Sequence, residues 1–309
     1  MLPQHITPTP SLCPYPVHET TVMIACRVMI ITMAKSQKVP IPLSLPCAKP
    51  RERRGKDTLF FFFFFSFREK EKMLGIFSSS VMSPPEELVV AGSRTPSPKT
   101  TAGKLLNRFV ESKPLAVSMQ VGEHVQLAYT HHNQSPWYPR SFAVKDEIFC
   151  LFEGALDNLG SLRQQYGLAK SATEVILVIE AYKALRDRAP YPANRVVCHL
   201  SGNFAFIVFD KSTSTLFVAS DQDGKVPLYW GITADGYVAF ADDADLLKGS
   251  CGKSLASFPQ GCFYSTAVGG LRCYENPKNK ITAVPAEEEE IWGAFFKVEG
   301  SAAVLAATE

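Results

Sequence analysis

The stretch Phe204–Gly231, FAFIVFDKSTSTLFVASDQDGKVPLYWG, decides the fold. Two runs of apolar, β-branched and aromatic residues, Phe204–Asp210 and Thr215–Ser220, are typical of buried strands. A charged tight turn at Asp221–Gly224 separates them from a third apolar run, Pro227–Gly231. The pattern predicts three strands, the last of which follows a hairpin turn.

The chain on either side of this stretch carries the same strand signal. Further strands are expected at Met73–Phe77, Ala116–Gln120, Val125–Tyr129, Glu147–Phe152, Tyr237–Ala241, Cys262–Tyr264, Gly270–Tyr274 and Ala294–Val298. The proline- and serine-rich segment Ser83–Asn107 lacks periodicity and is expected to be an irregular surface excursion.

Helical spacing appears between the strands. One helix is expected over Asn158–Tyr166, ending at Gly167, and a short one over Asp242–Leu247. Between them, Ser171 and Glu174 have the spacing of a capping box ahead of a wide apolar face. Many strands with an inserted helical pair predict an α+β fold, with sheet packed on sheet and helices outside.

Residues 1–72 do not have the pattern of a folded domain. They hold 11 Lys/Arg and 5 Asp/Glu, a net charge of +6, whereas residues 73–309 carry −4. The run Phe60–Phe65 followed by mixed Arg, Glu and Lys is typical of an untranslated leader that has been translated by mistake. This pattern favours Met73 as the start. A plastid transit peptide is the alternative interpretation. No apolar run reaches the length of about 20 residues that a bilayer span needs.

The eight cysteines have no C-x-x-C spacing, and five of them follow residue 72. This pattern predicts reduced, mostly buried thiols rather than a disulfide framework or a zinc site. The faintly acidic domain also lacks the basic stripe expected of a nucleic-acid-binding protein.

Seven short motifs in order resemble class II glutamine amidotransferase domains, including the glutaminase half of asparagine synthetases. They lie at Gly154–Asn158, Leu162-Arg163, Glu174–Ile176, Gly202–Asp210, Asp221–Gly231 (with Asp221, Gly224 and Pro227), Phe240-Ala241 and Pro259–Gly261. The resemblance runs from Met73 to about Tyr274. It implies a domain at 73–309 with the four-layer α/β/β/α sandwich of N-terminal nucleophile hydrolases.

One plant subfamily is more similar still, the aluminium-induced or stem-specific proteins with YGL and LRDR motifs. Both motifs occur here. They are Tyr166, Gly167 and Leu168, and Leu185, Arg186, Asp187 and Arg188. Their positions at helix ends favour a structural role over a ligand-binding one.

Four elements that the resemblance implies for glutamine hydrolysis are altered. Leu74 stands where the family has its cysteine nucleophile. The oxyanion-hole triplet is Glu153-Gly154-Ala155, so a carboxylate replaces the asparagine amide. No arginine for the substrate carboxylate occurs near Gln126, and Ala172 replaces the aspartate that binds the substrate amine.

Other chemistry-bearing residues carry a weaker signal. Ser78–Ser80 and His131-His132 are expected to be ordinary strand-end and surface residues. Asp221–Gly224 has too few oxygen ligands for a metal loop, and no phosphate-binding glycine loop occurs. We therefore expect no cofactor and no metal.

These observations favour a catalytically degenerate domain that senses a ligand or binds a protein in plant stress or growth responses. The alternatives are an active hydrolase or amidotransferase of altered chemistry, with another nucleophile in the same cleft, and a structural dimer subunit. The expected partners are an amino-acid-like small molecule and a second copy of the chain, without nucleic acid. The expected location is the cytoplasm, with the nucleus as a second location.

Overall fold

The computed structural model describes residues 72–94, 97–113, 115–131, 140–188, 193–287 and 289–299. All of them belong to one unit of the chain, Phe63–Glu309.

Two six-stranded antiparallel sheets form the centre of this unit. The first has the order β10-β8-β9-β1-β3-β2. Its strands are β1 (Met73–Phe77), β2 (Ala116–Val121), β3 (Val125–Thr130), β8 (Tyr229–Ile232), β9 (Val238–Ala241) and β10 (Leu255–Ser257). The second has the order β12-β11-β7-β6-β5-β4. Its strands are β4 (Phe142–Lys145), β5 (Ile148–Leu156), β6 (Gly202–Asp210), β7 (Thr215–Ser220), β11 (Cys262–Ser265) and β12 (Gly270–Cys273).

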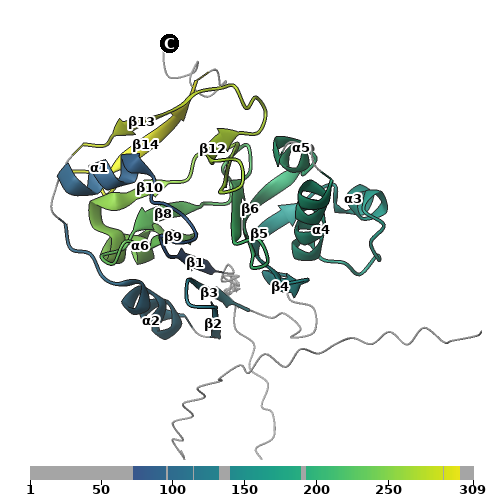
Figure 1. Cartoon of the computed structure of the whole chain (residues 1–309), viewed down its shortest axis with the longest axis horizontal. Helices are drawn as coiled ribbons and strands as arrows, with labels where there is room; N and C mark the ends of the chain where they lie inside the picture. Colours follow the sequence, from purple (N-terminus) through teal and green to yellow (C-terminus); the bar gives the residue numbers. More distant parts are fainter. Residues whose placement is uncertain are drawn as a thin grey trace, which may run out of the picture. The chain divides into compact units, whose positions relative to one another are not determined.

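Helices cover the outer face of each sheet (Figure 1). The first sheet is covered by α2 (Ala102–Ser112) and α6 (Ala244–Cys251). The second is covered by α3 (Leu159–Gln165), α4 (Glu174–Asp187) and α5 (Ala193–Cys198). A nine-residue helix, α1 (Glu86–Arg94), packs beside β10 and the 3-10 helix at Gly252–Ser254.

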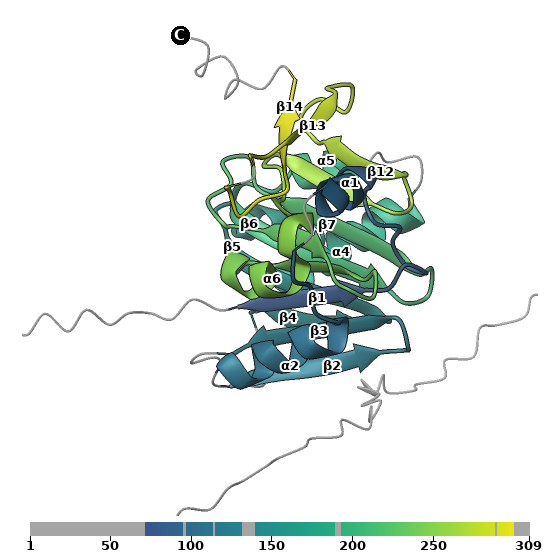
Figure 2. The ribbon, with the colours of Figure 1, turned by 90° about the vertical axis from the view of Figure 1, so that its left-hand side faces the viewer.

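A two-stranded sheet of β13 (Ile281–Pro285) and β14 (Ala294–Val298) completes the described part of the chain. Figure 2 shows this pair at one end of the molecule, near β12 and α1, while α2, β2 and β3 lie at the other end.

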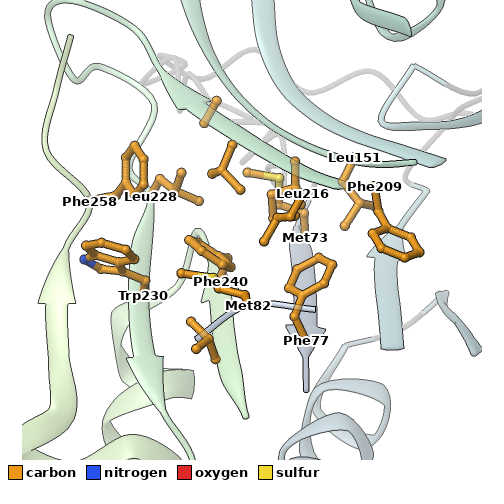
Figure 3. Packing of buried hydrophobic residues seen from close by; sticks show 14 of the residues in the cluster. Met73, Phe77, Met82, Leu151, Phe209, Leu216, Leu228, Trp230, Phe240 and Phe258 are labelled. Atoms are coloured by element: carbon orange, nitrogen blue, oxygen red, sulfur yellow. The ribbon is translucent and has the colours of Figure 1, made fainter. Parts of the chain in front are cut away.

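The layers follow from strands whose two faces are both buried. Along β6, Phe204, Phe206 and Val208 pack under the helices, while Ile207 and Phe209 face the first sheet. Because successive side chains on a strand point to opposite faces, this continuous apolar run needs cover on both sides. Figure 3 shows the core between the sheets, with the labelled side chains of β1, β6 and β8 directed into one cluster.

The predicted α/β/β/α sandwich is confirmed. The strands expected at Met73–Phe77, Thr215–Ser220 and Ala294–Val298 have the predicted bounds, and the other expected strands lie within a few residues of theirs. The strands β4, β10 and β13 and the helix α5 were not predicted, because each is short and gives little periodicity.

Two predictions about the helices are wrong. Ser83–Asn107 is not an irregular excursion, because it contains α1 and most of α2. Prolines mask two short amphipathic patterns there, in which Leu88 and Leu105 are fully buried. The capping box is also absent: α4 begins after Thr173, and Glu174 is its first residue.

The turn at Asp221–Gly224 is not a hairpin, since β7 and β8 belong to different sheets. The segment crosses from one sheet to the other around the buried carboxylate of Asp221. This carboxylate accepts backbone N–H groups of Phe204 at 3.1 Å and of Lys225 and Val226 at 3.2 Å. A charged residue in the turn thus anchors the crossover by satisfying buried backbone donors.

Gly224 provides a test of this crossover. Its φ is +62°, and a Cβ atom there would lie 2.7 Å from Gln260 Oε1. We expect Gly224→Val to lower the free energy of unfolding by more than about 1 kcal/mol, measured by urea denaturation. The neighbouring exposed Gln222→Val should change it by less than about 0.5 kcal/mol; equal effects would show that the turn does not constrain residue 224.

Candidate functional site at the start of strand β1

Strand β1 lies in the middle of the first sheet, between β9 and β3. All five of its residues are buried. Met73 and Phe77 face the second sheet, whereas Leu74 and Ile76 pack against α2 and α6. Leu74, at the position of the expected nucleophile, is 0% exposed and contacts a layer of helices rather than β5.

A buried ion pair lies directly before this strand. Lys72 Nζ is 3.0 Å from Asp242 Oδ2, and the Asp242 side chain is fully buried. The other oxygen, Oδ1, accepts the backbone N–H of Met73 at 3.2 Å. The backbone of Lys72 is fixed from the other side, because its N–H donates to Thr130 Oγ1 at 2.8 Å and its carbonyl accepts from Thr130 N at 2.9 Å.

Glu153 on β5 joins the same cluster. Its half-buried carboxyl group hydrogen-bonds to that of Asp242. Burial raises the pKa of Asp242, although Lys72 and Glu153 oppose this rise. Burial alone would lower the pKa of Lys72, but the adjacent Asp242 carboxylate outweighs it and the pKa is raised.

The cluster therefore holds two carboxyl groups and one ammonium group. With both carboxyl groups ionised it would carry a net negative charge in a poorly solvated place. A single proton shared by Glu153 and Asp242 removes that charge, as like charges in contact resist joint ionisation. Such a site can exchange a proton, but a carboxylate here opposes a developing oxyanion.

The sequence predicted Glu153 as part of the cleft but missed Asp242 and Lys72. Asp242 was assigned to a helix that in fact begins at Ala244, with Asp243 as its N-cap. The available signal was a pair of aspartates directly after the apolar strand β9. Ala241 faces the helices, so the next residue, Asp242, points to the opposite face of the sheet. From there its carboxylate can reach the start of β1.

The remaining residues that the sequence predicted for the cleft are Gly154, Ala155, Gln126 and Ala172, and their surroundings are as follows. Gly154 has a φ of +112°, and any Cβ atom there would collide with the carbonyl of Asn203. Ala155 is exposed, and Gln126 on β3 is half-buried. The carbonyl of Ala172 accepts from Arg163 Nε at 2.8 Å, which holds the turn before α4. Gly154 is therefore required by packing whether or not its N–H serves a ligand.

The YGL motif forms the end of α3. Tyr166 is its C-cap, and Gly167 follows with a φ of +65°. The N–H of Leu168 donates to Arg163 O at 2.8 Å, which closes a Schellman-type cap.

The LRDR motif ends α4 and ties it to β6. Arg186 donates to Asp187 Oδ1 at 2.7 Å and to Asp210 Oδ2 at 3.0 Å. Burial alone would raise the pKa of Asp210, but Ser212 and Arg186 outweigh burial and hold it below its usual value.

Other candidate groups are isolated from the cluster. Ser78 Oγ and Ser80 Oγ are 2.6 Å apart. Lys99 Nζ donates to Ser254 Oγ at 2.6 Å, and burial lowers the pKa of Lys99. Ser254 is fully buried, however, so its hydroxyl group is closed to a substrate.

Metal ligands and disulfides are absent from the part of the chain that the structure describes. No group of three His, Cys, Asp or Glu residues there could hold a metal ion. All five cysteines after residue 72 are free; four are buried, and Cys198 is exposed. His132 lies outside the described residues, while His131 contacts the carbonyl of Leu115 at 2.9 Å.

The layered fold is that of a class II amidotransferase-like domain. The family model described as "Aluminium induced protein" matches residues 74–298, which is most of the chain. The chain therefore belongs to the aluminium-induced protein family.

Sequence relatives agree with this assignment. The stem-specific protein TSJT1 of Nicotiana tabacum is 44% identical over 149 residues, covering 48% of this chain and 99% of that protein. The glutamine-hydrolyzing asparagine synthetase 2 of Arabidopsis thaliana is 36% identical over 101 residues. That match covers 32% of this chain but only 17% of the synthetase.

Solved structures with a similar arrangement are distant in sequence. The glutamine phosphoribosylpyrophosphate amidotransferase of B. subtilis has a TM-score of 0.44 at 12% identity, over 68% of this chain and 50% of that one. A glutamine aminotransferase class-II domain protein of Silicibacter pomeroyi has a TM-score of 0.37 at 12% identity, over 65% and 96%.

Within the described residues, no helix has both the length and the apolarity that a membrane crossing requires.

The two arginines of the LRDR motif form a matched pair for a stability test. We expect Arg186→Gln to lower the free energy of unfolding by about 2 kcal/mol, because it removes a charged partner from buried Asp210. Arg188→Gln, in the turn after α4, should cost less than about 0.5 kcal/mol. Chemical denaturation of both variants checks this; equal losses would contradict the assigned role of Arg186.

The raised pKa of Asp242 predicts how the stability of the fold depends on pH. Its pKa is raised in the folded state, so the native protein binds more protons than the unfolded chain between the unfolded and folded pKa values. Its contribution to stability is therefore present at low pH and declines as the pH rises through that window. Asp242→Asn, which keeps an acceptor for Met73 N–H, should become more stable relative to wild type from pH 4 to pH 8. Urea unfolding across that range checks this, and a pH-independent difference would contradict it.

Proposed function

We propose that the chain is a catalytically degenerate class II glutamine amidotransferase-like domain that acts as a ligand-sensing or protein-interaction module. The observation that carries the proposal is the environment of Leu74. Its side chain is fully buried against α2 and α6, and it offers no group that could attack an amide.

The surrounding charges support the same interpretation. A glutaminase site stabilises negative charge as it develops on the amide oxygen. Here Glu153 and Asp242 share a hydrogen bond near the start of β1, with Lys72 as the compensating cation. Two carboxyl groups at this place oppose the stabilisation of an oxyanion.

The biological setting follows from the family. The names of the family and of the tobacco relative favour a role in plant stress, with aluminium as one signal, or in growth. We also propose an amino-acid-like small-molecule ligand, a homodimer and a cytoplasmic location. Light scattering on the purified protein tests the dimer, and a monomeric mass at micromolar concentration would exclude it.

The second candidate function is hydrolysis with another nucleophile. The Lys99–Ser254 pair favours it, because a lysine with a lowered pKa can deprotonate a serine. Its burial weighs against it, since a substrate would have to displace the packed segment around Ser254.

A glutaminase assay separates the two functions. We expect no ammonia release from glutamine above that of heat-inactivated protein, because loss of a nucleophile commonly lowers the rate about a millionfold. Leu74→Cys alone should stay inactive, since Glu153 still opposes the oxyanion and the new thiol would lie among helices α2 and α6.

The variant that combines Leu74→Cys with Glu153→Asn, Ala172→Asp and Gln126→Arg should also stay inactive, because these changes correct the charges but leave the thiol among the helices. Ammonia release by the unmodified protein that is lost in Ser254→Ala would favour the second candidate. Release that is lost in Glu153→Gln would contradict the first.

A further inference from the structure

Two cysteines stand directly opposite each other in the antiparallel hairpin of β11 and β12. The strand register pairs Cys262 with Cys273. The N–H of Tyr274 donates to the carbonyl of Gly261 at 3.1 Å, so the ladder hydrogen bonds flank the two cysteines and do not join them. In such a non-hydrogen-bonded pair the Cα atoms lie about 4.5 Å apart, and the side chains approach each other more closely than in a hydrogen-bonded pair.

Both thiols point to the same face of the second sheet. Cys262 and Cys273 belong to the core between the two sheets, whereas the next residues, Phe263 and Tyr274, belong to the core under the helices. Cys262 is 0% exposed and Cys273 is 4% exposed. Burial raises the pKa of the Cys262 thiol, and the nearby Cys273 raises it further. Both thiols are free in this structure.

This placement fits the geometry of a disulfide. A disulfide needs Cα atoms about 4.4–6.8 Å apart and Cβ atoms about 3.5–4.5 Å apart. The Cβ atoms of directly opposed residues lie about 4.5–5.5 Å apart, and closer in non-hydrogen-bonded pairs. A small adjustment of the hairpin is therefore sufficient to form the bond. Among the cysteines that the structure describes, only these two are register partners of each other.

The position of β12 gives a reagent a way to the buried pair. This strand is at the edge of the second sheet and pairs with β11 on one side only among the described residues. Its residue Arg272 is exposed and Leu271 is half-buried. Edge strands open locally at a lower free energy than the whole fold. Opening of β12 therefore exposes Cys273 and uncovers Cys262 without unfolding the domain.

We propose that Cys262 and Cys273 form a redox-sensitive pair that a low-molecular-weight disulfide, such as oxidised glutathione, converts into a cross-strand disulfide. The thiolate of one cysteine attacks oxidised glutathione, which forms a mixed disulfide and releases one glutathione thiolate. The second cysteine then attacks the protein sulfur of the mixed disulfide and releases the second glutathione. The protons of the two protein thiols pass to the two glutathione thiolates, so one disulfide is reduced as the other forms.

The bond would tie the edge strand β12 covalently to β11. In a reducing compartment both thiols stay free, and a rise in oxidised glutathione closes the pair. The proposal goes beyond the proposed function, because it concerns another part of the fold and holds whether or not the site at β1 hydrolyses glutamine.

The test equilibrates the full chain in buffers with an increasing share of oxidised glutathione, followed by alkylation of the remaining thiols and mass spectrometry. Trypsin cleaves after Arg272 and separates the two cysteines into the peptides 254–272 and 273–278, so the bond appears as a linked pair of peptides. We expect the ratio of disulfide to dithiol to be at least about tenfold higher in the native protein than in urea, because a bond that fits the fold is favoured by it. Equal ratios, or no linked pair under any condition, would overturn the proposal.

Two variants assign the effect to this pair. Oxidation should raise the urea midpoint of unfolding of the wild type, and equally that of Cys198→Ala, which removes the exposed cysteine of α5. Oxidation should leave the midpoint of Cys262→Ala unchanged. A raised midpoint in oxidised Cys262→Ala, a lowered midpoint in the oxidised wild type, or linkage of Cys273 to Cys198 in place of Cys262 would overturn the proposal.

Discussion

The rest of the structure depends on strand β1 being buried on both of its faces. Met73 and Phe77 close the core between the sheets, while Leu74 and Ile76 close the core under α2 and α6. Each apolar side chain of this size stabilises the fold by about 1.5–3 kcal/mol when fully buried. Leu74 thus contributes to stability, and a polar group at this position would lose both packing and solvation.

The same strand organises the charged groups at its start. Backbone pairing with Thr130 fixes Lys72, and this places its ammonium group against Asp242. Glu153 then comes within hydrogen-bonding reach from the facing sheet. Breaking such a buried pair on one side is strongly unfavourable, whereas the intact pair adds little net stability. The cluster is therefore better understood as a specific polar site than as a device for stability.

The sequence predicted the layers because they follow from residue periodicity. The apolar run of β6 requires cover on both faces, and the structure supplies it with α4 on one side and β1 on the other. The local errors arise where short-range chemistry competes with tertiary contacts. Asp221 looked like part of a hairpin turn because the sequence does not reveal that β7 and β8 pair in different sheets. The prolines around α1 hid a helix that is held by its burial of Leu88 and Ala91.

The candidate site was predictable only in part. Leu74 and Glu153 stand within local motifs, so their departure from the amidotransferase pattern is visible in the sequence. Asp242 meets them from a position 168 residues after Leu74 in the chain, and only the pairing of β1 with β9 brings it there. The direction of the Leu74 side chain likewise depends on strand register and not on its neighbours in sequence.

Covalent labelling with a diazoketone analogue of glutamine tests the central claim most directly. Such an analogue alkylates an activated nucleophile that binds the glutamine side chain, and intact-protein mass spectrometry detects the adduct. The account predicts no glutamine-protectable adduct in the unmodified chain. A stoichiometric adduct that glutamine prevents, on any residue of the cleft around β1, would contradict it.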